Sequence, residues 1–189
     1  MDPAALAASL QHAAPGVEIE RATATDSHTT VYVSPDDLAA AARALHDAAD
    51  LAFVLLADVT AIDFWPREPR YEVVYMLVSV AHRQRLRVKV RLTAADAHLR
   101  TVSDIWPAAN WLEREVWDLF GIVFDDHPDP RRLLMPEDWE GHPLRKDYPV
   151  QLHMTPRSAQ PLQVTAEEFR ASVERDRLVR HEQRCTADL

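Results

Sequence analysis

The densest group of residues able to do chemistry lies between positions 113 and 129. It contains Glu113, Arg114, Glu115, Asp118, Asp125, Asp126, His127 and Asp129. Carboxylates and an imidazole are ligands for divalent metals, so a metal-dependent enzyme using His127 is one interpretation. On a helix, however, Glu113 and Glu115 point to different faces because they are two residues apart. Arg114 and Asp118 are four apart, which favours an ion pair within the helix instead.

Other catalytic arrangements lack the residues they need. The single cysteine, Cys185, cannot form an internal disulfide or supply the roughly four thiolates of an iron–sulfur cluster. Three glycines are too few for a phosphate-binding loop or a dinucleotide fingerprint. No serine lies in a nucleophile-elbow sequence. We therefore expect no catalytic, cofactor-binding or metal-binding residue in this chain.

Charge suggests a protein partner rather than a nucleic acid. Acidic residues outnumber basic ones 30 to 21, giving a formal net charge of -9, which argues against binding to a phosphate backbone. Residues 83–91 are locally basic, a pattern that suits docking onto a charged protein and equally suits a solvated surface. RNA binding by residues 85–91 is a weaker alternative, because no aromatic side chains are interleaved there.

The elements that must position the polar cluster follow from hydrophobic periodicity and turn residues. We predict helices over 3–13, from Ser34–Asp37 to about Ala49, and from Pro107 to Gly121. Strands are predicted over 17–20, Thr29–Val33, Leu51–Thr60, Tyr71–Val80 and Arg85–Leu92, the last two as an antiparallel hairpin. This order predicts an α+β fold: a two-layer domain with a mixed or antiparallel sheet and helices on one face.

The chain changes character after residue 120. Prolines recur from 128 to 161, and a segment this long without regular structure is unusual within a compact domain. Its apolar residues, among them Phe124, Leu134 and Trp139, argue against plain disorder. We therefore predict three parts: an α+β platform over 1–120, an extended partner-binding arm over 121–164, and a short exposed helix and tail over 165–189.

We recognise no membrane-spanning segment and no targeting signal in the sequence. No stretch approaches the roughly 18 uncharged apolar residues of a membrane span. The N-terminus lacks the early basic residues of a secretory signal or a transit peptide. We expect a chain that acts outside the bilayer.

The sequence WLEREVWDLFGIVF at 111–124, the following DDHPDPRRLL and the later EDWEGHPLRKDYP at 137–149 resemble a known family. It is the 30 kDa-subunit family of respiratory complex I, which includes the C subunit of the bacterial NADH–quinone oxidoreductase. The matching segment covers about 110–150 and is long and specific.

The resemblance implies a non-catalytic structural subunit of the peripheral arm of a proton-translocating complex. It implies docking on the large, D-type hydrogenase-like subunit near the quinone site, beside a cluster-bearing B-type subunit, on the cytoplasmic side of the bacterial membrane. FMN, iron–sulfur clusters, NADH and quinone would be bound by other subunits. The predicted partner interface comprises Glu113, Arg114, Glu115, Asp118, His127, Arg131, Arg132, Leu133, Trp139, Arg145, Lys146 and Asp147. An equivalent subunit of a membrane-bound hydrogenase, or of a complex with another electron donor, is the alternative.

Overall fold

The computed structural model describes residues 3–15, 17, 19–22, 29–149, 167 and 170. The chain divides into two units, Met1–Tyr148 and Pro149–Leu189. The predicted helix after residue 165 lies outside the described residues except for Glu167 and Arg170, both of which are helical. The description below concerns the first unit.

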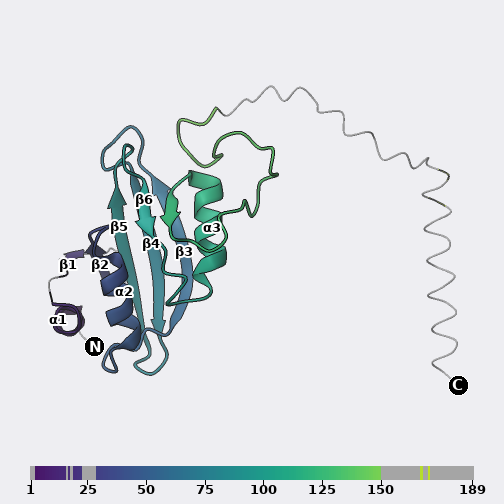
Figure 1. Cartoon of the computed structure of the whole chain (residues 1–189). Helices are drawn as coiled ribbons and strands as arrows, with labels where there is room; N and C mark the ends of the chain where they lie inside the picture. The colour runs from purple at the N-terminus through teal and green to yellow at the C-terminus, as the bar shows by residue number, and fades with distance from the viewer. Residues whose placement is uncertain are drawn as a thin grey trace, which may run out of the picture. The chain divides into compact units, whose positions relative to one another are not determined.

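The described residues of this unit form three helices and seven strands (Figure 1). In chain order they are α1 (Pro3–Ala13), β1 (Ile19–Ala22), β2 (Thr29–Val33), α2 (Leu38–Asp47), β3 (Leu55–Asp63), β4 (Tyr71–Ser79), β5 (Gln84–Leu92), β6 (His98–Arg100), α3 (Ala109–Phe120) and β7 (Val123–Asp125). The main sheet has the order β1-β2-β5-β4-β3, in which only β2 and β5 are parallel. A small parallel sheet joins β6 to β7. The predicted α+β class with a mixed sheet is confirmed.

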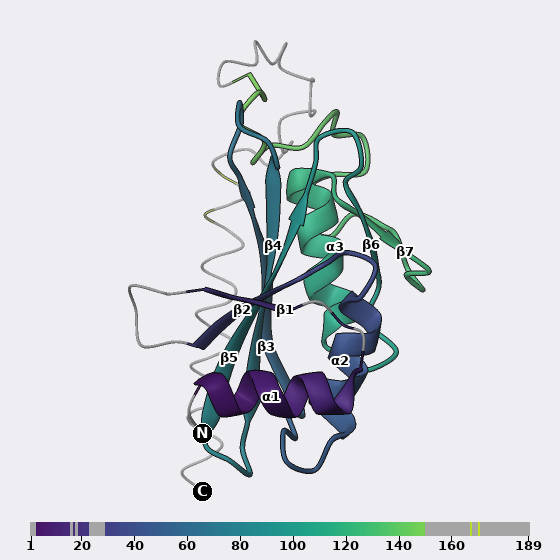
Figure 2. The same ribbon diagram turned by 90° about the vertical axis from the view of Figure 1, so that its left-hand side faces the viewer.

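The core lies between the main sheet and helices α2 and α3, which share one face of it (Figure 2). Alternating residues of β5, Leu86, Val88 and Val90, face the helices and are buried, as the predicted apolar/polar alternation requires. Helix α2 contributes Leu38, Ala41 and Leu45 from one stripe. The opposite face of the sheet carries no helix within the described residues.

Local differences from the prediction have physical causes. The strand predicted over Leu51–Thr60 begins only at Leu55, because Leu51 and Phe53 enter the core from a turn in which Ala52 has a positive φ of 45°. Short strands β6 and β7 were not predicted, since three residues carry too little periodicity. Helix α3 ends at Gly121, as predicted, with φ 74° in the left-handed region that favours glycine.

The predicted boundary after residue 120 does not coincide with the division of the structure. Residues 121–148 belong to the same compact unit as the sheet and α3. They are mostly without regular structure, as expected, but hydrogen bonds fasten them to α3 and to the end of β3. Phe124, which the prediction placed in the partner-binding arm, is buried in the core of its own chain. Within the described residues no helix is long and apolar enough to cross a bilayer.

Candidate functional site: the clamp between α3 and residues 126–148

Three charged side chains of α3 are buried, which is unusual for a surface helix: Glu113, Arg114 and Asp118. Each must find hydrogen-bond partners, because burying an unsatisfied charge is costly. Their hydrogen-bond partners come from two other parts of the chain, residues 101–102 for Glu113 and residues 129–135 for Arg114 and Asp118. The contacts of Arg114 and Asp118 help to hold residues 126–148 against the helix, and we call this arrangement the α3 clamp.

Asp118 is the centre of the α3 clamp. Its Oδ2 accepts the backbone N–H groups of Leu133, Leu134 and Met135 at 3.0, 2.7 and 2.8 Å. Its Oδ1 lies 2.6 Å from the guanidinium of Arg132. Burial alone would raise the pKa of this carboxyl, but these hydrogen bonds outweigh burial and lower it. Asp118 is therefore an ionised structural anchor whose oxygens are already engaged.

Arg114 holds the same segment one turn earlier. Its guanidinium donates to the carbonyl oxygens of Arg131 and Arg132 at 2.9 and 3.0 Å, and lies 3.3 Å from a carboxylate oxygen of Asp129. The predicted ion pair between Arg114 and Asp118 is wrong. Both side chains instead form hydrogen bonds with the segment after β7, because the buried backbone groups of that segment need hydrogen-bond partners.

Arginines from the segment complete the α3 clamp at the C-terminal end of the helix. Arg145 Nε donates a hydrogen bond to the carbonyl oxygen of Phe120 at 2.5 Å. The backbone N–H of Leu144 donates one to the carbonyl oxygen of Leu119 at 3.0 Å. These are carbonyls that a helix leaves without intrahelical partners. Arg132 reaches forward to the carbonyls of Trp139 and Gly141 at 2.8 and 3.2 Å. The last helical turn and residues 131–145 therefore order one another.

A second anchor, not predicted from the sequence, ties the end of the segment to the main sheet. Asp63, the last residue of β3, accepts two hydrogen bonds from Arg70, at 3.0 and 2.9 Å, and one from the backbone N–H of Lys146, at 2.8 Å. Arg70 also pairs with Asp147 at 2.6 Å. Burial opposes ionisation of Asp63, but its hydrogen bonds to Arg70, Lys146 and Trp65 lower its pKa to about 2. A carboxylate at an inward-facing position at the end of the strand was the signal available in the sequence.

Glu113 faces the core rather than the segment. It accepts hydrogen bonds from the Thr101 hydroxyl at 2.5 Å and from the backbone N–H of Val102 at 2.8 Å. Burial dominates over these bonds and raises the pKa of Glu113 to about 7. A cavity of about 40 Å³ beside it is walled partly by Trp117 and Phe124. Glu113 is thus a carboxyl that gains or loses its proton near neutral pH.

His127 lies beside Glu113, with Nε2 3.8 Å from a carboxyl oxygen. The backbone N–H of Asp129 donates to Nδ1 at 3.0 Å, which leaves Nε2–H to donate to the carbonyl of Asn110 at 3.1 Å. Burial lowers the pKa of His127, so the neutral ring fits this arrangement. Both ring nitrogens are engaged, and the described residues contain no group of three or more metal-ligating side chains. The geometry does not favour the metal-enzyme interpretation.

The other predicted interface residues differ in their exposure. Arg131 is exposed and pairs with Asp129, and Lys146 is exposed although its backbone N–H is bonded to Asp63. Glu115, Leu133 and Trp139 are half-buried. The indole N–H of Trp139 is buried without an acceptor among the described residues. Most residues of the predicted partner interface thus lie around α3, and several of them contact other residues of their own chain.

Comparison with known proteins gives the same family throughout. The sequence model of the respiratory-chain NADH dehydrogenase 30 kDa subunit matches residues 31–153. The C subunit of the NADH-quinone oxidoreductase of Geobacter metallireducens is 52% identical over 123 residues, which are 65% of this chain and 75% of the relative. Its counterpart from Geotalea uraniireducens is 48% identical over 122 residues, covering 65% and 73%.

Solved structures agree with the sequence comparison. A trypsin-resistant fragment of Nqo5 superposes with a TM-score of 0.52 at 36% identity, covering 66% of this chain and 98% of the fragment. A chain of an archaeal membrane-bound sulfane sulfur reductase superposes with a TM-score of 0.66 at 28% identity, covering 79% and 87%. The residues of the α3 clamp lie within the matched range 31–153. The chain belongs to the family of the 30 kDa subunit of respiratory-chain NADH dehydrogenase.

Proposed function

We propose that this chain is a non-catalytic structural subunit in the peripheral arm of a proton-translocating NADH–quinone oxidoreductase. It docks on the large, D-type hydrogenase-like subunit near the quinone site, close to a cluster-bearing B-type subunit on the cytoplasmic side of the membrane. FMN, iron–sulfur clusters, NADH and quinone are held by other subunits. The names of its relatives support this assignment.

The observation that carries the docking proposal is the surface of the α3 clamp. Trp111 on α3 is 60% exposed and Leu134 in the segment is 58% exposed, while Leu144 is 47% exposed. Large apolar side chains at such exposure are typical of interface anchors when they stand on a rigid support. The hydrogen bonds of Asp118, Arg114 and Arg145 supply that support before docking, which lowers the entropic cost of binding.

The interior of the clamp argues for a structural rather than a chemical role. Asp118, Arg114 and Arg132 use their polar atoms on the backbone of the segment or on one another. Groups saturated in this way are poor candidates for binding substrate. The arginines predicted to meet a partner's carboxylates act here mainly on their own chain, and exposed Arg131 is the one best placed to reach a partner.

An affinity pull-down of tagged chain from gently solubilised native membranes tests the proposal. We expect the large hydrogenase-like subunit, cluster-bearing subunits and polytopic membrane subunits to be recovered. Leu134→Asp and Trp111→Ser should reduce recovery, whereas Val80→Asp should not. Val80 is a matched control because it is 65% exposed but lies in the turn between β4 and β5. Normal recovery with both clamp variants would refute docking through this surface.

A related complex with another electron donor is the second candidate, because of the similarity to a chain of the sulfane sulfur reductase. The electron-input subunits recovered with the tagged chain would distinguish the two. Recovery of the chain alone with a bound metal ion would instead support the free-standing enzyme around His127.

A further inference from the structure

We propose that the face of the main sheet left uncovered by the described helices of this unit is a second docking surface, which binds an acidic amphipathic helix of a neighbouring subunit. We call it the open face. It is distinct from the α3 clamp, because α3 packs on the other side of the sheet (Figure 2). The proposal requires only that the chain works within a multisubunit complex, and it explains the basic stretch 83–91, which the α3 clamp does not use.

One half of the open face is cationic. The residues of β5 that alternate with its buried core positions are Arg85, Arg87, Lys89 and Arg91. The strand has no carboxylate, although the chain as a whole has a net charge of -9. Within the sheet, Glu72 pairs with Lys89 at 2.7 Å and Glu20 with Arg91 at 3.0 Å. Exposed Arg85 takes part in no ion pair among the described residues, so this row can accept further negative charge.

The adjoining half of the open face is apolar at one end. Strand register places Val78 opposite Arg85 on β5 and opposite Leu55 on β3. Leu55 is 47% exposed and Ile62, at the other end of β3, is 39% exposed. Met76, paired with Arg87, is half-buried between them. Exposed Asp58 and Thr60 lie on β3 between Leu55 and Ile62. The apolar stripe therefore comprises Leu55, Met76 and Val78 at one end of this face, beside the cations of β5.

The dimensions suit a helix. A nine-residue strand is about 30 Å long, the length of a helix of about 20 residues. Alternate residues of β5 are about 7 Å apart along the strand, and helical positions i and i+4 are about 6 Å apart along the axis. Carboxylates at that helical spacing would align with successive cations, while the helix's apolar stripe covers Leu55, Met76 and Val78.

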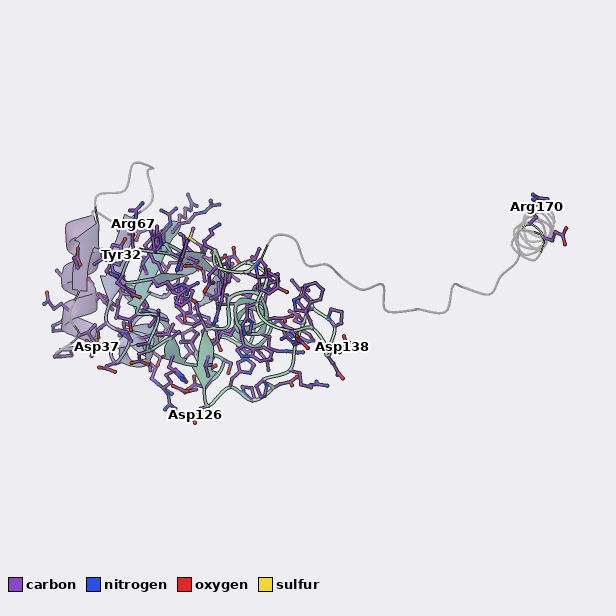
Figure 3. The ribbon with its side chains drawn as sticks, turned by 90° about the horizontal axis from the view of Figure 1, so that it is seen from above. Tyr32, Asp37, Arg67, Asp126, Asp138 and Arg170 are labelled. Atoms are coloured by element: carbon purple, nitrogen blue, oxygen red, sulfur yellow. The ribbon has the colours of Figure 1, made fainter. Side chains whose placement is uncertain are left out.

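One end of the open face is shaped to receive side chains. The guanidinium of Arg91 stacks 3.7 Å above the ring of Tyr32. Two hollows, of about 290 and 230 Å³, are both bounded by this stacked pair, and the second is also lined by Phe64 and Arg67. Figure 3 shows Tyr32 and Arg67 near one another on this flank. Arginine and tyrosine in such a setting are typical of binding hot spots.

A protein partner fits better than a nucleic acid. Glu72 and Glu20 already neutralise two of the four cations, Lys89 and Arg91, so this face lacks the run of cations that a phosphate backbone binds. The apolar stripe would remain uncovered by a phosphate backbone. RNA bound at this face is therefore an outcome of the test that would contradict the proposal.

Site-specific photo-crosslinking in the purified, assembled complex tests the inference. A benzophenone amino acid replaces Leu55 in one variant, Trp111 in a second and exposed Arg100 of β6 in a third. We expect the Leu55 probe to label one peptide of a neighbouring subunit that has more carboxylates than cations. Arg85→Glu should lower that yield by about tenfold, whereas the matched Arg100→Glu should leave it unchanged.

The Trp111 probe separates the two proposals. Labelling from Trp111 with none from Leu55 would show an assembled complex whose open face is bare, and would overturn this inference alone. A Leu55 adduct with RNA or with a peptide lacking excess carboxylates would overturn it as well. Absence of the chain from the complex would overturn the proposed function and this inference together.

Discussion

Glu113 should make the fold more stable at pH 5 than at pH 8. Its pKa is about 7 in the folded chain and 4.5 in the unfolded reference. Between these values the folded state binds more protons than the unfolded state, so the free energy of unfolding falls as pH rises. The difference of 2.5 pKa units at 1.36 kcal/mol each amounts to about 3 kcal/mol, fully present below pH 4.5 and lost above pH 7.

Urea unfolding of the wild type and of Glu113→Gln, followed by tryptophan fluorescence from pH 5 to pH 8, measures this contribution. Glutamine keeps an acceptor for Thr101 or Val102 but carries no charge. The free energy of unfolding of the variant minus that of the wild type should therefore rise by about 2.5 kcal/mol across this range. Taking the difference cancels the opposite effect of His127, whose lowered pKa favours the fold as pH rises toward 6.5.

Glu115→Gln is the matched control, because it removes a partly exposed carboxylate from the same helix. A difference between Glu113→Gln and wild type that stays constant from pH 5 to pH 8 would refute the reasoning. Glu113 would then not change its protonation in the folded chain over this range.

Two further predictions concern the α3 clamp. Asp118→Asn should lower the free energy of unfolding at pH 7 by about 3 kcal/mol, because it leaves the largely covered guanidinium of Arg132 without its charged partner. Limited proteolysis should then cut within 126–148. Exposed Asp125→Asn is the control, and equal protease resistance of the two variants would contradict the prediction. Gly121→Ala should lower the free energy of unfolding by about 2 kcal/mol, because φ at this position is 74° and the added Cβ would clash with Arg145 and His142. An unchanged melting temperature would show that the end of α3 is not constrained.

The sequence predicted the parts of the structure that depend on local periodicity. The apolar stripe of α2, the alternation along β5 and the glycine that ends α3 each reflect the geometry of a single element. It also located the residues of the motif around α3. Prediction from the sequence failed where hydrogen-bond partners are distant along the chain, as with the expected ion pair of Arg114 and Asp118. Spacing of four residues on a helix permits that pair but says nothing of the backbone donors and carbonyls that compete for both side chains.

Asp63 and Arg70 illustrate the same limit. They lie 83 and 77 residues from their respective partners Lys146 and Asp147, and no local pattern links them. By itself the sequence determined the longer helices and strands, the α+β class and the family, because periodicity, turn chemistry and a long motif can all be read along the chain. Only the tertiary structure decided that residues 126–148 fold back on α3, since that depends on which remote backbone groups the buried charges of one helix can reach.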